Sequence, residues 1–202
     1  MARRNDHTRE ELAEMILTAA RDIVRVDGFQ ALTARAVASR IGYSAGTLYN
    51  LFGNLSEIIL RMNADTLDRL LAAVRGIPEG VDPERELLAM ADAYILFTDE
   101  DAPLWNALFE YRLPAGETMP DWYLDRIENL FLIPEAALAP LFGPDEGESR
   151  RKSARVLWSG VHGIRSLAST GKLGVVASET VADMTRDLVR TYLAGLTAQR
   201  RT

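Results

Sequence analysis

The stretch that decides the fold is LTARAVASRIGYSAGTLYNLF, which spans residues 32–52. It predicts two short helices joined by a tight turn at Gly42, because a residue without a Cβ adopts positive φ at little steric cost. Ser44 offers a side-chain oxygen that caps the second helix. In that helix Leu48 and Phe52 lie four residues apart and share one inward-facing side. A helix, a glycine turn and a second helix form the pattern that places a recognition helix in the major groove of DNA.

The same residues resemble a known family of proteins. The matching positions are Leu32, Thr33, Val37, Ala38, Gly42, Ser44, Gly46, Thr47, Leu48, Tyr49 and Phe52, with Gly28-Phe29 before them and Glu57-Ile58 after them. In these positions the chain resembles the DNA-binding domain of the TetR family of bacterial transcriptional repressors. The Gly-Thr-Leu-Tyr run at residues 46–49 is more specific than a bare helix-turn-helix pattern. The alternative is a two-helix corner in some other helical protein.

Length and composition suit such a protein. The 202 residues, with 48% hydrophobic and 26% charged, are enough for a compact DNA-reading domain and a larger second domain. The absence of cysteine excludes disulfides and thiol chemistry. No run of 18 apolar residues predicts a membrane span, and the N-terminus lacks the apolar core of a secretory signal. We therefore expect a cytoplasmic protein.

The charge is distributed unevenly along the chain. Residues 1–52 hold seven Arg and six acidic residues, a balance of +1, and the remainder holds sixteen basic and twenty-three acidic residues, a balance of −7. The acidity therefore lies away from the expected DNA-binding end, where local cations decide phosphate affinity. We expect moderate, salt-sensitive affinity that needs two copies of the domain. Met1 to His7, with Arg3 and Arg4, is either a frayed terminus or a basic arm that contacts phosphates or the minor groove.

The apolar periodicity predicts an all-α protein of roughly nine helices. Residues 1–53 form the expected helix-turn-helix domain, 54–82 a connecting helix and a linker, and 83–202 the effector-binding and dimerisation domain. The family resemblance implies that the connecting helix joins the two domains. Leu55 stands where the family usually has a lysine that grips a phosphate, so one such contact is expected to be missing.

The C-terminal half predicts a long helix that Pro134 kinks or breaks. Gly160 and Gly163 lie within a later helix, where each costs about 1 kcal/mol relative to Ala, a cost that is tolerated where another backbone must approach closely, as at a tight helix–helix contact. The last helix is expected to begin at Ser178 and to bury Val181, Met184, Leu188, Tyr192 and Leu196. The resemblance implies a four-helix dimer bundle with a two-fold axis. Its expected interface residues are Val161, Ile164, Ala168, Met184, Leu188 and Tyr192.

A second resemblance covers this half. Trp158, His162 and Gly163, with Asp82-Pro83, Tyr94, Pro103 and Leu108-Phe109 upstream, resemble the TetR subgroup whose ligand domain is named for its Trp-His-Gly motif.

No residue pattern in the sequence indicates a catalytic site. His162 has no carboxylate three or four positions away to orient it, and no metalloprotease, phosphate-loop, dinucleotide or nucleophile-elbow motif is present. We expect no enzyme, no metal and no cofactor. His162 is either a hydrogen-bonded packing residue or a ligand contact.

An aromatic group in the second half is the expected effector site, with plain core as the alternative for each member. Ligand pockets are mainly apolar with a few polar groups, and Tyr and Trp offer both. The expected residues are Tyr94, Phe97, Trp105, Phe109, Trp122, Ile127, Trp158 and His162. The pattern favours a mainly apolar small molecule, whose identity the sequence does not reveal.

The expected mechanism places two recognition helices roughly 34–36 Å apart, in successive major grooves of a near-palindromic operator. Tyr43, Ala45, Gly46 and Thr47 lie where bases are approached, and Thr33, Tyr49 and Asn50 where phosphates are bound. The full set of expected DNA-binding residues is Thr33, Arg35, Tyr43, Ser44, Ala45, Gly46, Thr47, Tyr49 and Asn50.

Effector binding is expected to favour a conformer in which the connecting helix swings the recognition helices out of register. The expected role is repression by blocking RNA polymerase, with activation left open. Two other classes remain as alternatives: an all-helical enzyme or carrier with an incidental helix-turn-helix, and a DNA-bound interaction protein that needs no effector.

Overall fold

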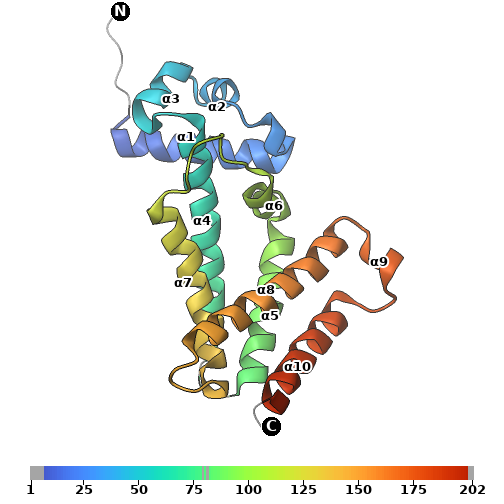
Figure 1. Cartoon of the computed structure of the whole chain (residues 1–202). Helices are drawn as coiled ribbons and strands as arrows, with labels where there is room; N and C mark the ends of the chain where they lie inside the picture. Colours follow the sequence, from blue (N-terminus) through green and yellow to red (C-terminus); the bar gives the residue numbers. More distant parts are fainter. Residues whose placement is uncertain (1–6, 79, 81, 200–202) are drawn as a thin grey trace, which may run out of the picture. The chain divides into compact units, whose positions relative to one another are not determined.

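The chain is helical throughout the described part of the computed structural model, which comprises residues 7–78, 80 and 82–199. These residues form ten α-helices and two short 3-10 helices and contain no strand (Figure 1). The all-α class is confirmed, and the helix beyond the expected nine is a four-residue turn of helix, α9 (Leu173–Val176). No helix among the described residues combines the length and apolar character needed to cross a membrane.

The helices pack into two compact units, which we describe separately. The first comprises the chain up to Arg69 together with Glu100–Arg126, and the second comprises Leu70–Asp99 together with Ile127–Thr202. Elements α4 (Leu55–Arg75), α5 (Pro83–Glu100) and α7 (Asp121–Leu138) contribute residues to both units. The packing units therefore differ from the predicted division at residues 53 and 82.

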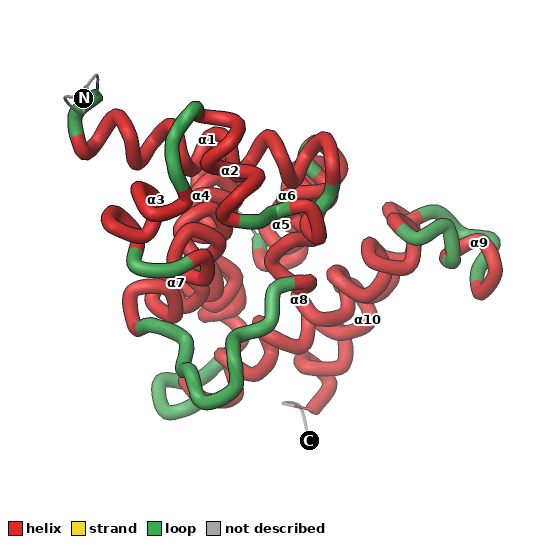
Figure 2. Tube along the Cα trace, turned by 90° about the horizontal axis from the view of Figure 1, so that it is seen from above, coloured by secondary structure: helices red, strands yellow, loops and turns green. Residues whose placement is uncertain are grey.

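The first unit begins with three helices that we call the head: α1 (Arg9–Asp27), α2 (Ala34–Ile41) and α3 (Ala45–Phe52). A 3-10 turn, η1 (Phe29–Ala31), joins the first two. Seen from above in Figure 2, α2 and α3 lie close to α1, which both of them contact. The short α6 (Ala102–Glu110) packs against α1 and η1 although it comes much later in the chain.

Local capping explains where the head helices begin and end. Helix α1 begins with a capping box, in which Thr8 Oγ1 accepts from Glu11 N at 3.1 Å and Glu11 Oε2 accepts from Thr8 N at 2.7 Å. Thr33 Oγ1 caps α2 by accepting from Ala36 N at 3.1 Å. Gly42 ends α2 in the left-handed region at φ 75°, as predicted.

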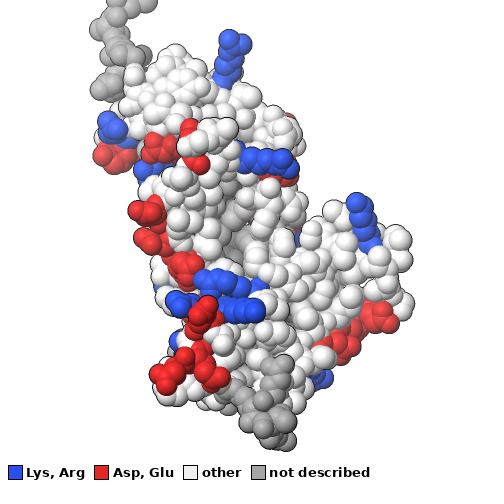
Figure 3. Space-filling model, viewed as in Figure 1, with Lys and Arg blue, Asp and Glu red and all other residues white. Residues whose placement is uncertain are grey.

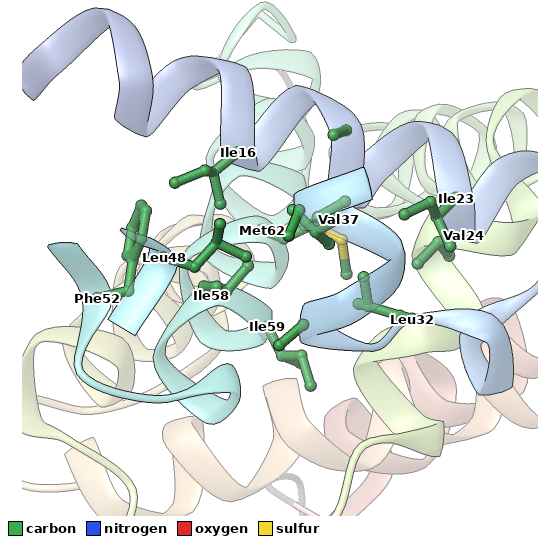
Figure 4. Close-up of a cluster of buried hydrophobic side chains, with 14 of the residues drawn as sticks. Ile16, Ile23, Val24, Leu32, Val37, Leu48, Phe52, Ile58, Ile59 and Met62 are labelled. Atoms are coloured by element: carbon green, nitrogen blue, oxygen red, sulfur yellow. The ribbon is translucent and has the colours of Figure 1, made fainter. Parts of the chain in front are cut away.

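The head shares one hydrophobic core with α4 and α6. Figure 4 shows side chains from α1, α2, α3 and α4 pointing toward one another in this core. Its fully buried members, each 0% exposed, are Ile16, Ala20, Val37, Leu48, Ile58, Met62, Leu104 and Ala107. Burying a Leu or Ile side chain stabilises a fold by about 1.5–3 kcal/mol. Because Leu104 and Ala107 belong to α6, the head is not packed independently of that helix.

Ion pairs around Asp101 link α1, α4 and the start of α6. Arg25 donates to its two carboxylate oxygens at 2.7–3.2 Å, and Arg69 donates at 3.1 Å. The Asp101 side chain is only 10% exposed, and burial by itself would raise its pKa. The two guanidinium groups outweigh burial and hold the pKa of Asp101 below its ordinary value.

The second unit is organised around two helices, α8 (Gly147–Ser169) and α10 (Val181–Gln199). They lie side by side and run in opposite directions in Figure 1, and Figure 2 shows the same pairing. The end of α7 leads into a 3-10 turn, η2 (Ala139–Leu141). The buried core of this unit comprises Leu87, Met90, Ala137, Leu138, Ala154, Leu157, Val189 and Leu193.

Pro134 does not break the helix that contains it. Helix α7 continues through Pro134 to Leu138, so the predicted break is wrong. A proline removes one helical hydrogen bond, but the residues after it are held by packing, because Ala137 is 5% and Leu138 0% exposed.

Helix α10 differs from its prediction in both start and buried face. It begins at Val181 rather than Ser178, because Thr180 Oγ1 accepts from Asp183 N at 3.1 Å and so provides the cap. Its buried residues are Thr185, Val189 and Leu193. The predicted row of Val181, Met184, Leu188, Tyr192 and Leu196 is only half-buried. The helix carries two apolar rows, and periodicity alone did not separate them.

The two glycines of α8 have different surroundings. A Cβ on Gly160 would lie 2.5 Å from Cδ2 of Leu188 on α10, whereas a Cβ on Gly163 would meet nothing within 4 Å. A tight contact with α10 is therefore present at Gly160, but the Leu188 side chain makes it and not the backbone that was predicted. The protomer gives no such reason for Gly163.

We predict that Asp101→Asn lowers the free energy of unfolding by about 1–3 kcal/mol, because it removes charged hydrogen bonds from a buried acceptor. Asp68→Asn is the matched control, since Asp68 is 51% exposed where it pairs with Arg126 and exposed pairs contribute about 0–1 kcal/mol. The measurement is urea unfolding of both variants at pH 7.

The same pair of variants gives a pH prediction. A depressed carboxyl pKa stabilises the fold above the unfolded value of about 3.9, and this stabilisation is lost as the pH falls through the folded value. The stability difference between wild type and D101N should therefore be full above about pH 5 and should shrink in more acidic buffer. A difference that stays constant down to pH 3 would contradict the assigned role of the Asp101 charge.

Candidate DNA interface and ligand site

Helix α3 presents one face to the core and the other to solvent. Leu48 and Phe52 are 0% and 4% exposed, so they anchor the helix as the sequence predicted. On the opposite side Tyr49 is 45% exposed and Asn50 is also exposed. The helix is therefore held rigidly while its polar side chains remain available to a partner.

The turn before α3 is stabilised by its own hydroxyl groups. Ser44 Oγ accepts from Thr47 N at 3.2 Å and lies 3.0 Å from Thr47 Oγ1. The Tyr43 hydroxyl lies 2.8 Å from Nδ1 of His7. His7 is the only residue of the predicted N-terminal arm that is described, and Arg3 and Arg4 lie outside the described residues.

Few cations accompany these polar groups. Arg35 on α2 is exposed and forms no ion pair within the described part of the chain, whereas Arg40 pairs with Asp27 at 3.4 Å. The face shown in Figure 3 carries few charged side chains over α2 and α3. Leu55, which stands in place of a lysine, is half-buried against the head core. Charge on this surface therefore comes from a small number of arginines.

The structure brings the predicted DNA-binding residues together on one surface region. All nine lie in α2, in α3 or in the turns that cap these helices, and each is exposed or half-buried. Thr33 serves as the cap of α2, so its oxygen is occupied while its hydroxyl hydrogen can still be donated.

The predicted effector residues are divided between the two units. Trp105, Phe109 and Trp122 belong to the first unit, and Tyr94, Phe97, Ile127, Trp158 and His162 belong to the second. Each group is therefore described on its own.

In the second unit the polar tips of the predicted residues bond to each other. The Tyr94 hydroxyl lies 2.7 Å from His162 Nδ1, and the Trp158 ring stacks on His162 with centroids 5.1 Å apart. Burial, followed by the nearby Arg165, lowers the pKa of His162. The imidazole is thus held neutral in a packed aromatic group, which favours the packing interpretation of His162 over a ligand contact.

In the first unit Trp105 and Phe109 form an edge-to-face pair with centroids 5.4 Å apart. Trp105 is 5% and Phe109 48% exposed. The guanidinium groups of Arg61 and Arg126 each lie 5.4 Å from the centroid of the Trp122 ring, so Trp122 is engaged in cation–π contacts.

Sequence reasoning missed two kinds of buried polar residue. Arg165 of α8 is 8% exposed and donates to Thr98 Oγ1 at 3.1 Å and to the Thr98 carbonyl at 3.2 Å. Asn63 of α4 is 1% exposed, and neither atom of its amide forms a hydrogen bond in the described structure. Asn63 lies four residues from both Ile59 and Leu67, so a polar residue within an apolar row was the available signal.

The expected dimer residues do not all reach the surface. Ile164, Ala168, Met184, Leu188 and Tyr192 are half-buried. Val161 is only 6% exposed inside the protomer, so little of its side chain is available to a second copy, and its place in a dimer interface stays a prediction. The described residues contain no cluster of three or more His, Asp or Glu side chains that could hold a metal ion.

The chain is similar in sequence or in structure to several known proteins. An uncharacterized HTH-type transcriptional regulator of Mycobacterium tuberculosis is 25% identical over 195 residues, which is 96% of this chain and 83% of that protein. A protein of unknown function from Rhodococcus sp. RHA1 has a similar structure, with a TM-score of 0.74 and 19% identity over 97% of this chain and all of that one. The FadR repressor of Thermus thermophilus, solved with lauroyl-CoA, has a TM-score of 0.66 and 21% identity over 91% and 94% of the two chains.

Two family models match the chain and together cover most of it. The family described as bacterial regulatory proteins, tetR family, matches residues 16–62, which include most of the head and the turn at Gly42. The tetracyclin repressor-like C-terminal domain matches residues 87–192. The finer likeness to the Trp-His-Gly subgroup stays a prediction. The two matches and the capped helix-turn-helix lead to one conclusion: this chain belongs to the TetR family of DNA-binding transcriptional regulators.

Proposed function

We propose that this regulator is a dimeric repressor, which binds a near-palindromic operator and leaves it when a small, mainly apolar effector binds. The observation that carries the proposal is the head itself. It presents a capped, rigidly packed recognition helix whose outer face bears exposed polar groups. The proposal places the protein in the cytoplasm, where operator DNA is found, and assigns it no catalytic activity.

The roles on DNA follow from side-chain chemistry. Thr47 and the backbone near Gly46 lie at the start of α3, where a recognition helix approaches base edges. Ala45 offers only an apolar contact, for example to a thymine methyl group. Arg35, Thr33, Tyr49 and Asn50 supply phosphate contacts, which position the protein without reading the sequence.

A second copy would cover the outer row of α10. Leu188, Tyr192 and Leu196 with their neighbours line a groove of about 610 Å³ on this helix, and the same residues are half-buried in the protomer. An apolar row beside a packed helix pair is the arrangement that a symmetric four-helix interface uses. Gly163 on α8 would let a neighbouring helix approach closely.

The effector would act through the helices that complete the head core. Leu104 and Ala107 of α6 are part of that core, and α6 follows α5 in the chain with only Asp101 between them. A change in α6 or α4 therefore disturbs the packing of the recognition helix. The effector shifts the equilibrium only by its different affinity for the DNA-bound and released conformers.

Similar solved structures offer precedents for the class of effector. The similar Thermus thermophilus structure contains lauroyl-CoA, so this fold can hold a long acyl chain. Lauroyl-CoA is accordingly the first compound to test, and free CoA is its control. A DNA-bound protein without any effector and an activator are the remaining candidates.

We predict that selection from a random duplex library recovers one inverted-repeat sequence at low salt. Tyr49→Ala and Arg35→Ala should weaken binding to all recovered sequences alike, because both residues contact phosphates. Arg35→Ala should also reduce the slope of log affinity against log salt by about one per protomer. Arg85→Ala, which removes an exposed arginine from α5, is the matched control and should leave binding unchanged. No enrichment with the wild type would contradict operator binding.

We predict that Tyr192→Glu converts the dimer into a monomer, because a charge would be buried in the apolar interface. Leu96→Glu, at a position 61% exposed on α5, is the control and should remain dimeric. Sedimentation velocity measures the mass of each protein. A wild type that sediments as a monomer at micromolar concentration would contradict the proposed dimer.

We predict that lauroyl-CoA releases the selected operator and raises Tm, whereas CoA does neither. The acyl chain supplies the apolar surface that favours binding. Fluorescence anisotropy of labelled operator measures release, and Tm is measured without DNA. Equal effects of CoA and lauroyl-CoA would argue against an apolar effector.

A further inference from the structure

One hydrogen bond fixes the point at which the N-terminal segment leaves the head. Nδ1 of His7 lies 2.8 Å from the hydroxyl oxygen of Tyr43, which is 36 residues away along the chain. The two rings are tilted by 59°, with centroids 6.1 Å apart. The next residue, Thr8, is held by the capping box of α1. The chain is therefore fixed to the head from His7 onward.

The Tyr43 side of this contact belongs to the turn between α2 and α3. Tyr43 lies between Gly42, which ends α2, and Ser44, which caps α3. Figure 1 shows the beginning of α1 on the side of the head where α3 lies, and the two helices are in contact. The far end of α1 is about 28 Å away, because its 19 residues each rise 1.5 Å. The N-terminal segment therefore leaves the head beside the recognition helix.

Two arginines precede this exit point in the sequence. Arg3 and Arg4 lie outside the described residues, so only the length of the chain limits their reach. An extended chain spans at most about 3.6 Å per residue, which keeps the Cα atoms of Arg4 and Arg3 within about 11 and 14 Å of that of His7. The major groove that receives a recognition helix is about 12 Å wide. The phosphates along its edges are therefore within reach when α3 is bound to DNA.

The described part of the head supplies few cations for those phosphates. Arg35 is exposed and forms no ion pair within that part of the chain, whereas Arg40 pairs with Asp27 at 3.4 Å. Leu55, which stands in place of a lysine, offers no charge. Affinity for duplex DNA depends strongly on the number of phosphates that cations neutralise. Two further arginines beside α3 would therefore make up a large share of the phosphate contacts.

The contact with His7 leaves Tyr43 able to bind DNA as well. A phenol hydroxyl both donates and accepts hydrogen bonds, and the His7 ring nitrogen uses only one of these functions. His7 is exposed and Tyr43 half-buried. His7 is therefore suited to hold the segment in place without occupying the polar side chains of α3.

We propose that residues 1–6 bind the DNA phosphate backbone beside the groove that receives α3, through Arg3 and Arg4. His7 is the positioning residue that directs them there by its bond to Tyr43. Only the DNA-binding character of the family is needed for this contact, and not the effector, the dimer or the operator of the proposed function. The contact is independent of sequence, because phosphates position a protein without specifying bases.

The charged residues of the segment carry opposite expectations. Arg3→Gln/Arg4→Gln removes two cations from the phosphates, whereas Asp6→Asn removes an anion. Each neutralised phosphate of B-DNA contributes about −0.9 to the slope of log affinity against log salt. The double variant should therefore have a slope that is shallower by about 1.8 per bound protomer. Asp6→Asn should instead strengthen binding at low salt.

The first test measures binding of the full-length protein to a mixed-sequence duplex without a selected operator, by fluorescence anisotropy at several salt concentrations. From about 50 to 200 mM salt, the advantage of the wild type over Arg3→Gln/Arg4→Gln should shrink about tenfold per bound protomer. Arg200→Gln/Arg201→Gln is the matched control, because it removes an arginine pair at the other end of the sequence, and it should keep the wild-type slope.

The second test separates the role of His7 from that of the arginines. His7→Ala should weaken binding about threefold, an effect at the low end for the loss of one hydrogen bond. It should have no effect when Arg3 and Arg4 are already replaced, or when Tyr43→Phe has already removed the hydroxyl. His7→Asn keeps a polar atom near the former Nδ1 and should restore the affinity, although it also removes the imidazole.

Several results would overturn the proposal. One is a wild-type salt slope in Arg3→Gln/Arg4→Gln, or an equal loss of slope in Arg200→Gln/Arg201→Gln. Another is an equal effect of His7→Ala with and without the arginines, which would show that His7 acts on the head itself. A changed base preference in Arg3→Gln/Arg4→Gln would show that the segment reads the minor groove, and would overturn the assignment to phosphates. Because the duplex holds no operator and no effector is added, these failures are distinguishable from a failure of the proposed function.

Discussion

The head of this regulator depends on a core that it does not complete by itself. Leu104 and Ala107 of α6 are fully buried with Ile16 and Leu48 of the head, although more than fifty residues separate them along the chain. Removing such side chains from a core costs roughly 2–5 kcal/mol, a large fraction of the stability of a small domain. The position of α3 within the head therefore depends on the packing of α6 against the same core.

Ion pairs also help to hold α6 against the head. Asp101 directly precedes α6 and accepts from Arg25 of α1 and Arg69 of α4. The two arginine side chains are each 40% exposed and the carboxylate 10% exposed, so water competes weakly for the acceptor and more strongly for the donors. These ion pairs favour one arrangement of α1, α4 and α6. The free energy that they contribute is nevertheless small enough for a ligand to oppose it.

Short-range rules predicted the head well, because its helix ends are decided by residues three or four positions apart. Ser44 and Gly42 act as their local patterns indicated. Long-range outcomes were not accessible in this way. Periodicity did not show which of two apolar rows of α10 faces α8, and nothing local links Arg25 with Asp101. Asn63 breaks an apolar row of α4, but the sequence alone did not show that the fold buries its amide.

A lightly charged head suits regulation by a weakly coupled ligand. Arg35 is exposed without an ion pair in the described region, while Arg40 is partly neutralised by Asp27, so each head gains limited affinity from phosphates. Couplings between sites typically amount to 1–3 kcal/mol, or about 5–150-fold in affinity. If the protein bound DNA very tightly, a coupling of this size would leave the operator occupied. In the proposed dimer, whose moderate affinity would require two heads in register, displacing α6 in either protomer would lower occupancy substantially. The sparse charge of the head and the dependence of its core on α6 therefore both make DNA binding sensitive to a weakly coupled ligand.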